Sequence, residues 1–319
     1  MKKLTKLALA ASVALSANAM AMQAMDDASL SATTGQDGIN IGIGISKIEI
    51  EKLFIHDNDG YTGAGGTGEA GAIYIQGNGT GATATKGIVI GANYDNGGAY
   101  LLPTRNLADL QIDSDAGNGN PFINIAAQVS GLDIHIGEIG VVASGVQNDP
   151  ASIRRGGTGT ENAILTGLSV KTGPMAANIQ LGAAPQGAMI NLNATMIGGL
   201  TIENLGILDQ STKSGTADGT AGNAKAGVIH IDKIQLADEN SRNLKLNQAI
   251  SVFGEQGADK GYVRIVSTSG AHDTYVKGIH LGSQTAASIG DMEVQGMQTY
   301  FSPALGQYTP GAIITIRGH

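Results

Sequence analysis

The sequence predicts an all-β protein built from a repeated strand unit. A ten-residue pattern, aliphatic–x–Ile–acid–x–aliphatic–x–aliphatic–x–Asp, begins at Ile48, Leu200 and Ile229, and looser copies begin at Ile134 and Ala287. We call these five segments the decads. Alternating aliphatics are typical of β-strands, and the two-residue break at the acid leaves room for a turn or a bulge.

The spacing of the decads favours a β-solenoid or β-helix-like architecture. Successive decads start 86, 66, 29 and 58 residues apart, and three of these intervals lie close to multiples of 29. Solenoid repeats are about 20–50 residues long, and a period of 29 residues lies within this range. The interval of 66 does not fit, and an elongated β-sandwich with glycine-rich loops stays as the alternative.

Further strands and loops fill one predicted domain, residues 38–319. Alternating or short apolar runs predict strands at Ile39–Ile45, Ala72–Ile75, Gly87–Ile90, Phe122–Ile125, Ala188–Leu192, Tyr262–Ile265 and Ala312–Ile316. Glycine-rich segments at 59–71, 77–87, 145–162 and 210–227 are expected to be loops. The best helix candidate is Asn243–Phe253.

The first nineteen residues have the pattern of a secretory signal peptide. Lys2, Lys3 and Lys6 precede an apolar stretch, and Ala17–Ala19 forms an A-x-A cleavage site, with cleavage after Ala21 as the alternative. The apolar stretch of about ten residues is half the roughly twenty that a membrane-spanning helix needs. We therefore expect export to the periplasm, cell surface or extracellular space, with residues 20–37 as a polar lead-in.

The composition narrows the range of partners. The chain carries 27 acidic and 19 basic residues, and loss of the three signal lysines makes it more acidic. An acidic surface repels nucleic-acid phosphate, so we expect no nucleic-acid partner. No later apolar run approaches membrane length, so we expect no membrane insertion. The chain has no cysteine and hence no disulfide, and glycine, at 48 residues, is about twice its usual share.

Two acidic segments have the spacing of calcium ligands. Asp57 and Asp59, and likewise Asp113 and Asp115, place carboxylates at alternate positions ahead of a glycine, which suits a hard cation. Asp and Gly together are also ordinary turn residues. We interpret both segments as turns, with calcium as the alternative, and expect no cofactor.

No set of residues has the spacing of a catalytic site. Neither a Ser/His/Asp arrangement nor a metal-binding histidine spacing occurs, and His135 and His230 are expected to face solvent. Arg154 and Arg155, the one arginine pair, lie in a glycine-rich loop that is either solvated or suited to an anionic sugar or a partner carboxylate. We expect no catalysis. The alternatives are a β-helical polysaccharide-acting enzyme and a secreted ligand-binding module.

Two hypotheses concern the faces of the strands. The segment Gly38–Ile45 is a candidate for joining one subunit to the next by strand addition, through Ile39, Ile41, Ile43 and Ile45; the alternative is that it begins the protein's own sheet. The decad acids Glu49 and Asp232 should lie near the surface. The decad aliphatics should face inward: Ile50, Leu53, Ile55, Ile202, Leu205, Ile207, Ile231, Ile234 and Leu236.

A short motif behind the signal peptide carries a family resemblance. Residues Met25–Ile41 contain an acidic pair, then Leu-Ser, then Thr-Gly-Gln-Asp-Gly-Ile leading into a strand. This motif, LS-x-x-TGQ-[DA]-GI, is similar to that of exported Gammaproteobacterial pilus-system proteins of the Fil type (FilA-like). The resemblance covers about residues 25–45 and brings no catalytic or ligand residues with it. It implies an exported structural or adhesive component of a surface filament or pilus, with other subunits or the assembly machinery as partners and with self-association.

Overall fold

The computed structural model describes residues 38–146, 152–213, 222 and 225–318. The predicted signal peptide and polar lead-in lie outside the described residues. Residues Ile39–His319 form one compact unit, which consists of strands and a few short helical turns. In the described part of the chain, no helix has the length and apolar character needed to cross a membrane.

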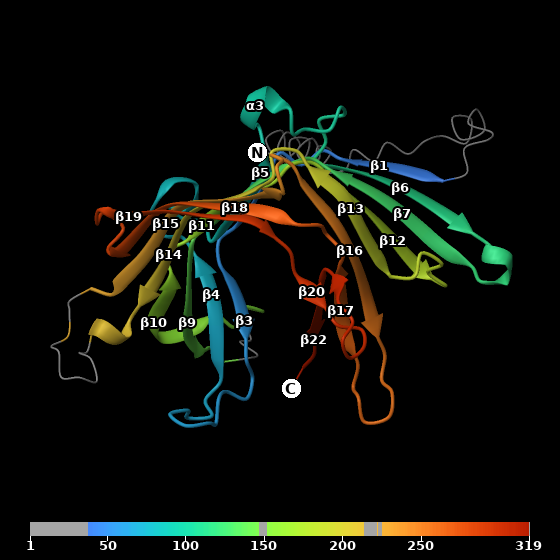
Figure 1. Ribbon diagram of the computed structural model, residues 1–319. Coiled ribbons are helices and arrows are strands. Elements are labelled where there is room, and N and C mark those ends of the chain that lie inside the picture. The colour runs from blue at the N-terminus through green and yellow to red at the C-terminus, as the bar shows by residue number, and fades with distance from the viewer. Residues whose placement is uncertain (1–37, 147–151, 214–221, 223–224, 319) are drawn as a thin grey trace, which may run out of the picture. The chain divides into compact units, whose positions relative to one another are not determined.

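Figure 1 shows the order of the elements along the chain. They are β1 (Ile39–Ile43), β2 (Lys47–Ile50), β3 (Leu53–His56), β4 (Gly71–Gln76), η2 (Gly81–Thr83), β5 (Ile88–Ala92), α3 (Asp95–Gly98), β6 (Ala108–Asp115), η3 (Gly117–Gly119), β7 (Phe122–Val129), β8 (Leu132–Ile136), β9 (Glu138–Ser144), β10 (Gly157–Leu165), β11 (Leu168–Lys171), β12 (Met175–Gly182), β13 (Ile190–Met196), β14 (Leu200–Asp209), η4 (Ser211–Lys213), β15 (Gly227–Asp238), β16 (Leu244–Phe253), β17 (Tyr262–Ser267), β18 (His272–Gly282), β19 (Ser288–Met297), β20 (Tyr300–Phe301), β21 (Thr309–Pro310) and β22 (Ala312–Ile316).

Two large sheets share one meander topology. The first sheet has eight strands in the order β1-β6-β7-β12-β13-β16-β17-β22. The second contains β2-β5-β8-β11-β14, extended by β15, β18 and β19, and β14 also leads through β10, β9 and β4 to β3. Successive runs of the chain each give a strand to both sheets, such as β7 then β8, or β13 then β14. Neighbouring runs pair in chain order, so the fold is an antiparallel meander of long, interrupted strands.

The described pairings do not show the expected solenoid. Stacked coils of a β-helix pair in parallel, whereas every strand pair described here is antiparallel. The decads lie in β2–β3, β8–β9, β14, β15 and β19, which are strands of the second sheet. The repeat therefore marks successive strands of a meander. Large antiparallel sheets are consistent with the sandwich-like alternative.

The predicted helix at Asn243–Phe253 is wrong, because β16 (Leu244–Phe253) occupies this segment. Leu244, Leu246 and Ile250 recur at even positions and pair with apolar residues of β13. Pairing with β13 on one side and with β17 on the other provides backbone hydrogen-bond partners along the segment as a strand. The period of two and these long-range partners outweigh a modest local helix propensity.

The break inside the decads is a shared kink of neighbouring strands. In β14, Asn204 has a φ of 59°. Glu203 pairs with Lys233 before the kink and Leu205 pairs with Ile231 after it, so the register between β14 and β15 does not change. In both strands, the alternation of side chains between the two faces therefore shifts at the same position, and the pairing of the strands continues.

The prediction that the decad aliphatics face inward is wrong for Ile55 and Ile207, which are 59% and 41% exposed. Beyond the break, the buried cluster is formed on the other face by Ala72, Tyr74 and Val142. The remaining aliphatics are half-buried: Ile50, Leu53, Ile202, Leu205, Ile231, Ile234 and Leu236. Glu49 and Asp232 are exposed, which confirms that part of the prediction. The alternation identified two faces correctly, but it did not show which one is covered.

Tyr74 is the largest side chain of this cluster and is 1% exposed. Its hydroxyl donates to Glu138 Oε1 at 2.9 Å, and burial followed by this carboxylate raises the pKa of Tyr74. We predict that Tyr74→Ala lowers the free energy of unfolding by about 3–5 kcal/mol, whereas Ile55→Ala on the adjacent strand costs less than about 1 kcal/mol. Urea unfolding of both variants measures the difference. Equal losses would show that the assignment of the two faces is wrong.

Between the sheets, the chain passes through connecting segments that we call the junction: residues 44–46, 93–107, 130–131, 172–174, 197–199, 239–243 and 268–271. Three buried polar residues hold it together. Ser130 accepts a bond from Leu102 N at 3.0 Å and donates to Asn106 O at 2.7 Å. Thr172 Oγ1 accepts a bond from Leu132 N at 2.9 Å, and Asn93 Nδ2 donates to Thr172 O at 3.1 Å.

Ser130 is fully buried, so its loss should be costly. We predict that Ser130→Ala lowers the free energy of unfolding by about 1–3 kcal/mol, because it leaves an N–H and a carbonyl group without their partner. Ser302→Ala is the matched control, since the Ser302 hydroxyl donates to Ala304 O on the exposed surface. Its loss should lower the free energy of unfolding by about 0.5 kcal/mol or less. Thermal unfolding measures the difference, and the prediction would be contradicted if both variants had the melting temperature of the wild type.

Candidate interaction surface

One face of the first sheet is aliphatic along all eight strands. Residues that pair directly across antiparallel strands lie on the same face, so the register defines the set. We call it the aliphatic face: Ile39, Ile41, Ile43, Ala108, Leu110, Ile112, Ser114, Ile123, Ile125, Ala127, Val129, Met175, Ala177, Ile179, Leu181, Ile190, Leu192, Ala194, Met196, Leu244, Leu246, Gln248, Ile250, Val252, Val263, Ile265, Ser267, Ala312, Ile314 and Ile316. None of these residues is charged.

In the described part of the chain, most residues of the aliphatic face are half-buried and eight are exposed. Ile39 is 61% exposed and Val252 is 63% exposed, while Ala194, Met196 and Leu244, which lie next to the junction, are buried. Exposed apolar patches on soluble monomers rarely exceed a few hundred Å². A continuous apolar face along eight strands is unusual for a monomer, so we interpret it as a candidate interaction surface.

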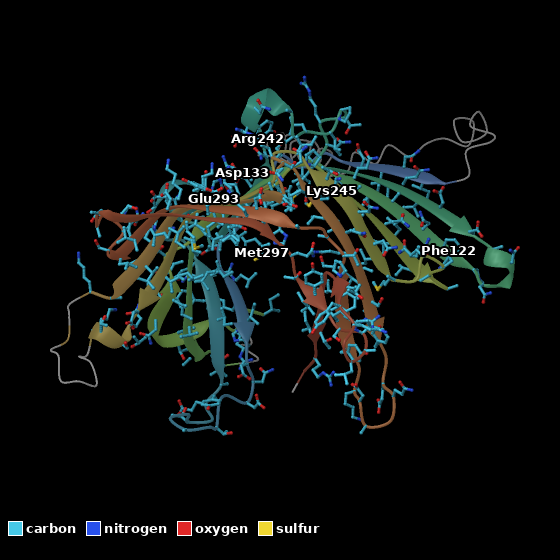
Figure 2. The ribbon with its side chains drawn as sticks, viewed as in Figure 1. Phe122, Asp133, Arg242, Lys245, Glu293 and Met297 are labelled. Atoms are coloured by element: carbon cyan, nitrogen blue, oxygen red, sulfur yellow. The ribbon has the colours of Figure 1, made fainter. Side chains whose placement is uncertain are left out.

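The opposite face of the same sheet is mainly polar over β6, β7, β12 and β13, whereas in β16, β17 and β22 it also carries Phe253, Tyr262, Val266 and Ile313. Asn124 and Asn178 exchange side-chain hydrogen bonds of 3.1 and 2.7 Å, and Gln180 Nε2 donates to Asn124 Oδ1 at 2.9 Å. In Figure 2, Phe122 marks the far end of this sheet and Lys245 lies close to the junction. Over β6, β7, β12 and β13 the two faces therefore differ in polarity.

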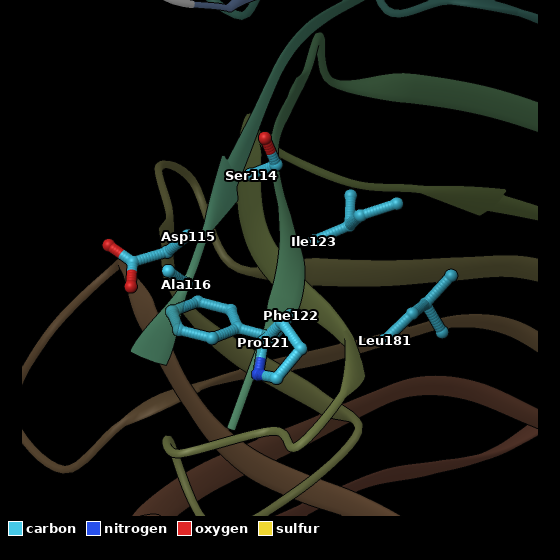
Figure 3. Close-up of a pocket in the computed structure, with 7 residues that line it drawn as sticks. All are labelled: Ser114, Asp115, Ala116, Pro121, Phe122, Ile123 and Leu181. Carbon is cyan, nitrogen blue, oxygen red and sulfur yellow. The ribbon is translucent and has the colours of Figure 1, made fainter. Parts of the chain in front are cut away.

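At the far end of the first sheet, the aliphatic face adjoins a cavity of about 430 Å³. Its lining includes Phe122, Ile123 and Leu181. Ile123 and Leu181 are a cross-strand pair, each 44% exposed, and Figure 3 shows them pointing to the same side. This pair is therefore an accessible position for testing the face.

The predicted assembly segment forms the edge of the same surface. Ile39, Ile41 and Ile43 pair with Ile112, Leu110 and Ala108 of β6 in the same chain. Ile45 follows the end of β1 and is 43% exposed. The strand thus begins the protein's own sheet, as the alternative hypothesis stated, and it supplies isoleucines to the aliphatic face.

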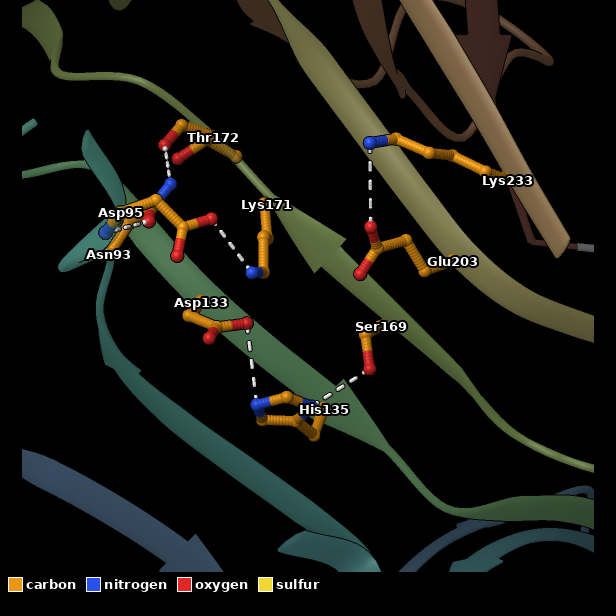
Figure 4. Close-up of polar contacts among 9 residues, drawn as sticks. All are labelled: Asn93, Asp95, Asp133, His135, Ser169, Lys171, Thr172, Glu203 and Lys233. Atoms are coloured by element: carbon orange, nitrogen blue, oxygen red, sulfur yellow. Dashed lines mark hydrogen bonds and ion pairs between the residues drawn. The ribbon is translucent and has the colours of Figure 1, made fainter. Parts of the chain in front are cut away.

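A row of paired charges crosses the second sheet (Figure 4). Lys171 Nζ donates to Asp95 Oδ2 at 2.8 Å, and this bond raises the pKa of Lys171. His135 contacts Ser169 Oγ at 2.8 Å and Asp133 Oδ1 at 3.3 Å. These side chains are partly exposed, and ion pairs near the surface contribute about 0–1 kcal/mol each, so we interpret the row as a solvated face.

The prediction that His230 faces solvent is wrong, because this residue is 2% exposed. It pairs directly with Gly206 on one side and His280 on the other. Asp232 Oδ1 lies 3.3 Å from Nε2 of both histidines. A Cβ at Gly278, which has a φ of 65°, would collide with the Asp232 carboxylate, so this glycine makes room for the cluster.

The Ala286 carbonyl, 2.6 Å from His280 Nδ1, raises the pKa of His280, and Asp232 raises it further. Because the pKa of His280 is raised in the folded protein, protonated His280 stabilises the fold fully below its ordinary pKa. This stabilisation is lost as pH rises through the pKa of the folded state. We predict that His280→Gln destabilises the protein more at about pH 5.5 than at about pH 8.5. Urea unfolding at both pH values measures this difference. The prediction would be contradicted if His280→Gln had the same effect at both pH values. It would also be contradicted if the pH dependence of this effect were unchanged in an Asp232→Asn background.

The four calcium candidates lie in two separate places. Asp59 N donates to Asp57 Oδ1 at 3.4 Å, and Gly117 N donates to Asp115 Oδ1 at 2.6 Å, which are turn contacts. Asp113 pairs with Asn124 on the polar face of the first sheet. Among the residues that the structure describes, no three His, Asp or Glu side chains are grouped to hold a metal ion.

The structure brings the arginine loop next to the end of the first decad. Arg155 Nη1 donates to Asn58 Oδ1 at 2.6 Å, although the two residues are 97 positions apart. The sequence does not connect these two segments, since only the pairing of β4 with β3 and β9 places them together. The aliphatic face was equally missed, although the alternation in each of its strands is visible in the sequence.

Residues 1–116 are similar to a family of unknown function, DUF6160. No curated protein and no solved structure matches the chain.

Proposed function

We propose that this protein is an exported, non-catalytic structural component of a bacterial surface filament, and that its copies associate through the aliphatic face. The observation that supports this proposal is the aliphatic face of the first sheet, which no layer formed by the described residues covers. The signal-peptide pattern and the FilA-like motif support export and a filament role. The sandwich-like architecture then arises between copies, when two such sheets pack together.

The size of the face suits a partner of protein dimensions. Eight strands about 4.8 Å apart, with about five residues of 3.3 Å each, cover about 650 Å². A stable interface buries about 800 Å² on each partner, so the face approaches that size by itself. A small ligand would leave most of it exposed.

A second copy of the chain is the occupant that we propose. Two sheets pack face to face about 10 Å apart when their inner faces are apolar, and a two-fold axis places the same patch on both partners. The chain has a formal net charge of −8, so copies repel one another over most of their surface. Contact through the uncharged aliphatic face keeps the like charges away from the interface.

The acids that end two decads support a structural role. Asp209 Oδ1 accepts bonds from Ser211 N and Ser211 Oγ at 3.0 and 2.6 Å. Asp238 Oδ1 accepts a bond from Lys245 N at 3.0 Å. Both carboxylates stabilise turns, which accounts for their recurrence without a role in sugar hydrolysis.

We predict that Leu181→Lys weakens self-association at least about tenfold, because a charge would enter an apolar interface. Asn193→Lys is the matched control, since Asn193 is exposed on the polar face of the neighbouring strand β13. Sedimentation of the mature chain measures the dissociation constant, and circular dichroism checks the fold of each variant.

A wild-type chain that stays monomeric at about 0.1 mM would overturn association through this face, as would equal weakening by both lysines. Electron microscopy of cells with and without the gene tests the filament role separately. Cells that lack the protein should lose or shorten a surface filament, and Leu181→Lys should reproduce that loss. Unchanged filaments in the deletion strain would contradict the proposed role.

A further inference from the structure

We propose that a cavity beside the arginine loop binds the carboxylate of an acidic sugar. The cavity measures about 560 Å³ and lies between the end of the first decad and the loop before β10. Its lining residues are Glu51, Lys52, Phe54, His56, Ile153, Arg154, Arg155, Gly156 and Gly157. The volume exceeds that of one sugar ring and falls in the usual range for small-ligand sites. The proposal does not depend on self-association, because it concerns the second sheet alone.

Arg155 is positioned in advance for a carboxylate. Its Nε donates to Gly145 O at 2.8 Å and its Nη1 donates to Asn58 Oδ1 at 2.6 Å. A guanidinium has five N–H donors, so three remain after these two bonds. A side chain held by such bonds loses little entropy on binding, and its planar fork matches a carboxylate.

Two further cations line the cavity. Within the described residues, the side chains of Arg154 and Lys52 form no ion pair and no hydrogen bond. Glu51 is the one carboxylate in the lining. Three cations against one carboxylate make a local positive site in a chain that carries 27 acidic and 19 basic residues overall.

The cavity also presents an aromatic wall. The rings of Phe54 and His56 stack with centroids 5.9 Å apart at an interplanar angle of 15°. Small-molecule sites combine apolar surface with a few polar groups that fix orientation. A sugar ring offers an apolar C–H face to Phe54, while its carboxylate faces the arginines, and this combination favours a uronic acid over a simple inorganic anion.

His56 provides a reporter inside the site. Its Nδ1 lies 2.5 Å from Ser144 Oγ, and its pKa is lowered by burial and then by the charge of Arg155. Asp57, the next residue, has an interaction of its own, and Arg155 is the charged side chain that lowers the pKa of the His56 imidazole. A carboxylate bound beside the ring favours the imidazolium form, so binding should raise the pKa of His56.

The test titrates the mature protein with trigalacturonate and follows binding by calorimetry and the His56 ring signals by NMR. We expect saturable binding, a raised pKa of His56, and at least about a tenfold loss of affinity in the double variant Arg154→Ala with Arg155→Gln. Lys245→Gln is the control, because it removes an exposed cation from the first sheet and should leave affinity unchanged.

Neutral trigalactose, inorganic phosphate and a glutamate tripeptide are the comparison ligands. Absence of trigalacturonate binding, equal affinity for trigalactose, or unchanged affinity in the arginine variant would overturn the proposal. Equal or tighter binding of phosphate or of the glutamate peptide would also overturn it, since the site would then select charge and not a carboxylated sugar. Self-association measured in parallel separates these outcomes from those of the aliphatic face.

Discussion

The whole meander depends on how its strands pass from one sheet to the other without losing hydrogen bonds. A strand that changes sheets interrupts its ladder, and an unpaired buried backbone group costs about as much as a lost hydrogen bond. At the junction, the side chains of Asn93, Ser130 and Thr172 replace the missing backbone partners. All three are buried, so water does not compete with them. These short polar side chains allow neighbouring runs to be interrupted at the same level and still remain paired.

This arrangement leaves only a small buried core among the described residues. The buried hydrophobic cluster of the second sheet is small, consisting of Ala72, Tyr74 and Val142 with Phe54 packed against it. A chain of this size ordinarily buries about three quarters of its unfolded surface. The aliphatic face of the first sheet is apolar enough to form a core, but lacks a covering layer among the described residues. A partner that binds only the folded state adds its binding free energy to stability, so assembly and folding would be linked.

The sequence predicted the features that depend on local alternation, such as strands. It did not predict the features that depend on pairing with distant segments of the chain. Alternating isoleucines correctly predicted strands, and the acid of the first decad and that of the decad at Leu200 correctly marked a break. The solenoid prediction failed because a repeat period does not tell whether neighbouring strands run parallel or antiparallel. His230 was assigned to solvent from its own strand, yet its burial comes from Gly206 and His280 on the two flanking strands. Likewise, Arg155 reaches Asn58 only because β9 pairs with β4 and β4 pairs with β3.

Electrostatic range explains how an acidic protein can hold a site for an acidic sugar. At physiological ionic strength the field of an exposed charge is screened over about 8 Å, so the net charge of −8 acts weakly on a ligand already inside the cavity. Lys52, Arg154 and Arg155 lie within the lining and act at contact distance, where screening is least effective. The same screening limits repulsion between copies that meet through an uncharged face. Short-range contacts thus govern both proposed interactions, and the acidic remainder of the surface opposes non-specific association with anionic polymers.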